Sequence, residues 1–138
     1  MLTTGDDQPV AQAVLSGERI LELRELARQI PVAEDIQKYA INMVLATHPD
    51  QPPATDMVKQ FVRYGSSPRG AQSLILYAKI LAVLDSRYHV AKDDINEAAH
   101  PVLRHRMILN FEGQAESINA DDIVDDLVQH AADLIAVS

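Results

Sequence analysis

The fold of this chain is decided by residues 65–84, which read GSSPRGAQSLILYAKILAVL. Ser67 can cap a helix through its hydroxyl, and Pro68 suits the first helical position because its missing N–H costs nothing there. In the second half of the stretch, Lys79 is the single charged side chain. A helix that is apolar on nearly every side belongs in the centre of a bundle. We therefore predict a central apolar helix over residues 68–85.

Arg69 lies in the first turn of this predicted helix. The N-terminal end of a helix favours negative charge, so a cation is out of place there. The arginine and the helix N-terminus make sense together if both face an anion, and a phosphate is the natural one. A solvated surface arginine is the alternative interpretation of the same residue.

Hydrophobic spacing predicts further helices on both sides of the central one. They are a segment capped by Ser16 and ended by Pro31, a segment around Ile36 and Met43 up to about Thr47, residues 54–63, a segment from about Lys92, and a segment after Asn119 with Ile123, Leu127, Ala131 and Leu134 inward. Residues 48–53, HPDQPP, form a loop that can reach towards Gly65. Residues 107–111 fit a short strand or an irregular buried segment.

The pattern as a whole predicts an all-α protein with about five to six helices around the central one. Leu81 is expected in the middle of the core. Residues 1–16 are interpreted as a linker, partly helical, and residues 17–138 as the helical domain.

Composition narrows the class of protein. The chain has 138 residues, a 47% hydrophobic share and a net charge of −8. This length suits one domain with its own core, and the acidic balance argues against nucleic-acid binding. The absence of cysteine, of a signal peptide and of a long apolar run predicts a soluble cytoplasmic protein with no membrane association.

Four motifs carry a resemblance that covers most of the chain. They are GSSPR at residues 65–69, RYHV at 87–90, DDI at 93–95 and LRHR at 103–106. In this combination they resemble the C-terminal lid of MoxR-type AAA+ ATPases. The fold implied is the helical AAA+ lid, with residues 1–16 leading in from an ATPase core.

The resemblance also implies roles for individual residues. Arg69 corresponds to the sensor-2 arginine, which with Ser67 and Pro68 would reach the ATP bound by the core domain. The cofactors implied for the full-length parent are ATP and Mg²⁺. Gly65, His105 and Arg106 are candidate lid–core contacts, and His105 is expected to be packed or hydrogen-bonded.

The implied partners are the core domain, neighbouring subunits of a ring, and proteins with von Willebrand factor A domains. The implied activity of the parent is chaperone-like ATP hydrolysis.

Two kinds of chemistry are missing from the sequence. There is no G-x-x-x-x-G-K-[ST] loop to cradle phosphates and no strand-like run ending in Asp-Glu to hold Mg²⁺. We therefore expect the isolated chain to be no enzyme, to use no cofactor, and to bind nucleotide at best with millimolar affinity. The five histidines lack the spacing of metal ligands, so no metal site is predicted.

A different class of function fits part of the same pattern. The chain could be a self-standing helical interaction module with no nucleotide, and residues 90–99 are similar to half of a histone fold. The acidic balance and the Ser-Pro-Arg helix start favour the lid.

Overall fold

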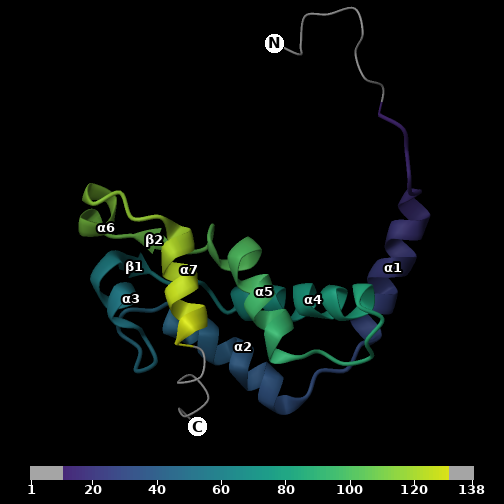
Figure 1. Ribbon diagram of the computed structural model, residues 1–138, viewed down its shortest axis with the longest axis horizontal. Coiled ribbons are helices and arrows are strands. Elements are labelled where there is room, and N and C mark those ends of the chain that lie inside the picture. Colours follow the sequence, from purple (N-terminus) through teal and green to yellow (C-terminus); the bar gives the residue numbers. More distant parts are fainter. Residues whose placement is uncertain (1–10, 131–138) are drawn as a thin grey trace, which may run out of the picture.

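The computed structural model describes residues 11–130 as a helical bundle with one short pair of strands (Figure 1). The described elements are α1 (Gly17–Gln29), α2 (Glu34–Ala46), α3 (Asp56–Phe61), β1 (Val62–Tyr64), α4 (Arg69–Leu84), α5 (Lys92–Leu103), β2 (Ile108–Leu109), α6 (Phe111–Ala115) and α7 (Ala120–Gln129). The predicted all-α class is confirmed. No helix among these residues combines the length and the apolar character needed to cross a lipid bilayer.

Helix α4 is the central element and packs mainly against α5, with further contacts to α2 and α1. Its buried face is formed mostly by small side chains, which let the neighbouring helices approach closely; the buried residues are Gly70, Ala71, Leu74, Ala78 and Ala82. Leu81 lies to one side of this face and is only half-buried. The expectation that Leu81 occupies the middle of the core is therefore wrong.

Several predicted helix ends are confirmed by the capping contacts. The Ser16 hydroxyl accepts a hydrogen bond from the Arg19 amide, and the Asn119 side chain accepts one from the Asp121 amide. In α7, Ile123 and Leu127 are fully buried as expected. The expected inward positions 131 and 134 lie outside the described residues, and residues 11–16 contain no helix.

The segment from residue 54 to residue 64 differs from the prediction. The helix ends at Phe61, and the chain continues as β1, which pairs antiparallel with β2. Val62 faces Leu109 and Tyr64 faces Ile108 in this pair. The strand alternative for residues 107–111 is thus confirmed at Ile108 and Leu109. The additional helix α6 follows directly, capped by Asn110, whose side-chain oxygen accepts from the Gly113 amide.

The turn between α4 and α5 is held by a charged pair. Arg87 donates two hydrogen bonds to the Asp94 carboxylate, at 2.8 and 2.5 Å, and one to Asp85 at 3.0 Å. Asp94 is 5% exposed and also accepts from the Ala91 amide at 2.7 Å. The Arg87 guanidinium, opposing the effect of burial, holds the pKa of Asp94 below its usual range. The RYHV and DDI motifs therefore meet in a structural contact.

We expect Asp94→Asn to lower the free energy of unfolding at pH 7 by about 1.5–3 kcal/mol, because it removes the buried carboxylate that accepts two hydrogen bonds from Arg87 and one from the Ala91 amide. A depressed pKa stabilises the fold above the ordinary carboxyl range and loses this contribution as the pH falls through the folded-state value. The difference between wild type and variant should therefore shrink below about pH 4. Urea unfolding at pH 7 and pH 3 measures it.

Asp85→Asn is the matched control, since Asp85 contacts the same guanidinium but its side chain is 67% exposed. It should cost less than about 1 kcal/mol at either pH. Equal losses in the free energy of unfolding for the two variants would show that the Asp94 contact stabilises the protein no more than the exposed Asp85 contact does.

Candidate functional site

The loop before α4 is anchored on the C-terminal end of α2. The Ser66 amide donates to Thr47 Oγ1 at 2.8 Å, and that hydroxyl donates onward to the Val44 carbonyl at 2.6 Å. His48 Nε2 lies 2.8 Å from the Ser66 carbonyl oxygen. A carbonyl oxygen only accepts, so this contact requires the histidine proton on Nε2. Thr47 and Ser66 are both fully buried, and together these bonds fix the loop in place.

Two glycines allow the loop to lie this close to α2. A Cβ atom on Gly65 would lie 2.6 Å from both the carbonyl oxygen and the hydroxyl of Thr47. A Cβ atom on Gly70 would collide with the Ser66 hydroxyl and come within 3.3 Å of Val44. Gly65 therefore allows close packing of the loop on α2. This explains why the GSSPR motif begins with a glycine.

The start of α4 differs in detail from the prediction. Ser67 does not cap the helix through its hydroxyl; its carbonyl oxygen accepts instead from the Gly70 amide at 2.7 Å. Pro68 occupies the position before the first helical residue. Ser67 and Pro68 are both exposed. The proline ring and the anchored Ser66 hold this turn, so a side-chain cap is not needed.

Arg69 is the first residue of α4 and its side chain is exposed. Its guanidinium forms no hydrogen bond or ion pair with any residue between 11 and 130. The first turn of α4 contains no acidic side chain, whereas each of the other helices described above has at least one. The N-terminus of α4 therefore has unopposed positive potential suited to an anion.

Arg106 is the second cation that the structure brings to α4. Its Nη2 atom donates to Ser73 Oγ at 3.2 Å, and Ser73 lies one helical turn after Arg69 on the same face. The Arg106 Nε atom is buried and has no hydrogen-bond partner among the described residues. His105 is exposed and forms no hydrogen bond with any residue between 11 and 130, so the expectation of a packed or hydrogen-bonded His105 is wrong.

An apolar groove of about 390 Å³ runs beside the start of α4, between α4 and α2. Its walls come from α2, the Ser66 loop and the first turns of α4, and include Ile41, Leu45, His48, Pro68, Ala71 and Ile75. Ile41 is 48% exposed, so the groove is open to solvent. The site thus combines a cation at a helix start with an apolar surface next to it.

Sequence reasoning found Arg69 but missed the residues that anchor the loop before it and the serine that contacts Arg106. Thr47, His48, Ser66 and Ser73 act through contacts between segments far apart in the chain. One sequence signal pointed to these contacts: the loop at residues 48–53 was expected to reach towards Gly65. Its first residue, His48, contacts the carbonyl oxygen of the neighbouring Ser66. In the part of the chain that the structure describes, no cluster of His, Asp and Glu side chains could hold a metal ion.

Comparison with known proteins gives a consistent result. The profile of the family described as "AAA lid domain" matches residues 54–127. The protein named "Chaperone MoxR1" from Mycobacterium tuberculosis is 30% identical over 128 residues, covering 93% of this chain and 34% of that protein. The "Uncharacterized protein YeaC" of Bacillus subtilis is 31% identical over 119 residues, covering 85% of this chain and 34% of its own length.

A solved structure is similar as well. The crystal structure of a "putative ATPase" from Cytophaga hutchinsonii superposes with a TM-score of 0.78 at 32% identity, over 86% of this chain and 36% of that one. The chain therefore spans about a third of the length of the relatives that it matches.

We expect Gly65→Ala to lower the free energy of unfolding by about 1–3 kcal/mol, because the new methyl group must displace backbone atoms of Thr47. Gly17→Ala is the matched control: a Cβ atom at this position, in the first turn of α1, meets nothing within 4 Å. It should be neutral or stabilise the protein by up to about 1 kcal/mol. Chemical unfolding of both variants measures the difference, and equal effects would contradict the close packing at Gly65.

Proposed function

The chain belongs to the AAA lid domain family and is of the MoxR type, and on this premise we propose that it senses ATP held by the core domain of a MoxR-like AAA+ ATPase. In this role Arg69 is the sensor-2 residue. It meets the phosphates of the bound nucleotide when the lid folds over the core.

The observation that carries the proposal is the exposed, unpaired Arg69 at the N-terminus of α4. Both its charge and the helix end attract the same kind of ligand, and phosphate is the anion that such helix starts bind most readily. The Thr47–Ser66–His48 contacts support the proposal, since they hold the loop before Arg69 in one conformation. A preorganised donor is worth more than one that must be ordered on binding.

The residues around Arg69 fit supporting roles. Ser67 and Pro68 form the turn that aims the arginine, and Gly65 keeps this turn on α2. Arg106 adds a second positive charge one turn along α4, which suits a polyanion such as a triphosphate. We assign Gly65, His105 and Arg106 to the contact between lid and core, with His105 available there because it is exposed.

The apolar groove beside Pro68 suggests where the rest of the nucleotide lies. A flat apolar ring fits a groove lined by aliphatic side chains better than a charged group does. A nucleobase placed there would leave its phosphates near Arg69. In the full-length ATPase, Mg²⁺ and most nucleotide contacts would belong to the core.

The consequence for the parent protein is coupling between nucleotide and movement. Occupancy of the site pulls the lid onto the core, and hydrolysis removes the anion that Arg69 faces. In a ring, rotation of the lid moves the neighbouring subunit. The name of the Mycobacterium relative fits a chaperone-like role, and we include proteins with von Willebrand factor A domains as partners and the cytoplasm as location.

We expect Arg69→Ala to lower the ATPase rate of the full-length parent by roughly tenfold to a hundredfold. Arginines that meet transferring phosphates directly as fingers are worth about 10³–10⁵, and a sensor on a mobile lid should contribute less. In the isolated chain the same change should leave the unfolding midpoint unchanged or slightly raised, because it removes a cation from a helix N-terminus.

Lys38→Ala is the control, since Lys38 is an exposed cation on α2 that pairs with Glu34 rather than lying at the site. It should leave the parent's rate unchanged. Unfolding of the isolated Arg69→Ala chain would make the arginine structural. A folded chain with a fully active parent would remove the phosphate role.

A further inference from the structure

Helix α1 is attached to the rest of the protein through a small contact. Of its 13 residues only Ala27 is buried, whereas six of the 12 residues of α5 are buried. The first six residues of α1 are all exposed, with Ile20 at 53% and Leu21 at 62%. A helix in a protein owes most of its stability to packing of its apolar face. Helix α1 is therefore held in place much less firmly than α5.

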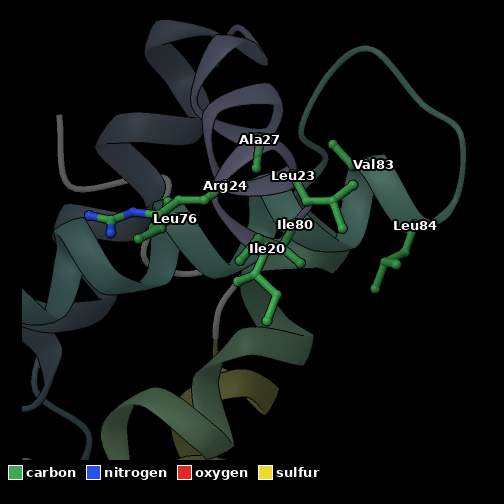
Figure 2. Close-up of a pocket in the computed structure, with 8 residues that line it drawn as sticks. All are labelled: Ile20, Leu23, Arg24, Ala27, Leu76, Ile80, Val83 and Leu84. Atoms are coloured by element: carbon green, nitrogen blue, oxygen red, sulfur yellow. The ribbon is translucent and has the colours of Figure 1, made fainter. Parts of the chain in front are cut away.

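Two grooves flank the contact between α1 and α4. The first has a volume of about 410 Å³, and Figure 2 shows Ile20 and Leu23 of α1 with Ile80 and Val83 of α4 in its walls. The second, of about 480 Å³, lies between the end of α1 and the turn that follows α4, and Val83 lines it as well. Because one side chain of α4 borders both grooves, the strip of α4 that α1 covers is narrow.

Within residues 11–130, one hydrogen bond joins α1 to another element. Lys79 Nζ of α4 donates to the Arg28 carbonyl oxygen at 2.9 Å. This carbonyl lies in the last turn of α1, where carbonyl groups have no partner inside the helix and the helix dipole favours a cation. The other side-chain bonds of α1 lie within the helix or its cap. Lys79 therefore holds the C-terminal end of α1 on α4.

The link between α1 and α2 is fixed independently of α1. Ile30 follows α1 in an extended conformation and is buried in the core, and Pro31 prevents the helix from continuing. Gln37 of α2 donates a hydrogen bond through Nε2 to the Val32 carbonyl oxygen at 3.0 Å. Rotation at the C-terminal end of α1 can therefore move this helix away from α4 without disturbing α2.

We propose that α1 is a hinged arm that leaves α4 while the rest of the bundle stays folded, and that Lys79 is the latch that holds it closed. This movement needs no nucleotide and does not depend on the role of Arg69. Local opening of this kind is expected of elements that bury few apolar side chains. Residues 11–16 enter the bundle through α1, so the arm sets the direction in which they leave it (Figure 1).

The open arm should be detectable because α1 cannot stay fully helical alone. The Ser16 cap and two exposed ion pairs give it some support of its own. A helix of 13 residues is nevertheless marginal in water once its packing is lost. Its amides should therefore exchange with solvent while the arm is open.

Amide hydrogen exchange of this chain, without any substitution, tests the arm. We expect the amides in the second half of α1 to exchange at least tenfold faster than those of α5. Low concentrations of urea should hardly change the α1 rates, because local opening exposes little new surface. The rates of α5 should rise with urea, since these amides exchange through larger openings.

Thiol labelling gives a second measurement, since the protein has no cysteine of its own. Ala27→Cys places a thiol on the buried side of α1, and Ala98→Cys is the matched control at a fully buried position of α5. Circular dichroism checks that both variants are folded. Without denaturant, a thiol reagent should modify Ala27→Cys at least tenfold faster than Ala98→Cys.

The latch is tested with Lys79→Met, which removes the donor and keeps the apolar stem. It should raise the exchange rate of α1 roughly threefold to tenfold, as expected for the loss of one hydrogen bond, and leave α5 unchanged. Lys79→Arg keeps a donor and should restore most of the protection. Lys59→Met is the control and should have no effect on α1, because Lys59 is an exposed cation of α3 that pairs with Asp56.

Two kinds of result would overturn the proposal. If α1 exchanges as slowly as α5, or if Ala27→Cys reacts as slowly as Ala98→Cys, then α1 opens only when the whole protein unfolds and there is no arm. If Lys79→Met changes nothing, or raises exchange equally in α1 and α5, then Lys79 is no latch. Exchange in the unsubstituted chain decides the first point even where a cysteine variant fails to fold.

Discussion

The site depends on the buried hydrogen bond from the Ser66 amide to the Thr47 hydroxyl. Both residues are closed off from solvent, so breaking this bond would leave polar groups buried without a partner. The bond exists because Gly65 has no side chain to separate the loop from the end of α2. From this point the chain has only Ser67 and Pro68 to cross before α4 begins. The direction of Arg69 is thus set by a contact outside its own helix.

Much of the bundle was predictable because its signals are local. Prolines, the Ser16 and Asn119 caps and helical spacing mark where most helices begin and end. The strands were not predictable with certainty, since two and three residues are too few to show alternation, and their pairing joins distant segments. Leu81 was misplaced because an all-apolar helix gives no pattern to tell its buried face from its exposed face.

In the candidate site too, the residues with a local sequence signal were predictable and those that depend on contacts between distant segments were not. Arg69 could be found because a cation in the first turn of a helix contradicts the local rule, and such contradictions occur at functional sites. The Arg106–Ser73 contact could not be found, since it depends on how β2 and α5 return the chain to α4. The Ser67 cap was predicted from the local sequence, but the Ser67 hydroxyl does not cap α4, because the turn is held by the anchored Ser66 and by backbone hydrogen bonds.

The short strand pair has a mechanical consequence. Tyr64 of β1 lies opposite Ile108 of β2, and each strand is close in sequence to one of the two arginines of the candidate site. Arg69 follows β1 after the anchored loop, and Arg106 precedes β2 with only Met107 between. The strand pairing therefore joins the segment that leads to Arg69 with the segment that follows Arg106, although the two lie far apart in the sequence. A substitution that separates the two strands would therefore disturb the backbone that leads to each arginine, and its effect would reach both ends of the candidate site.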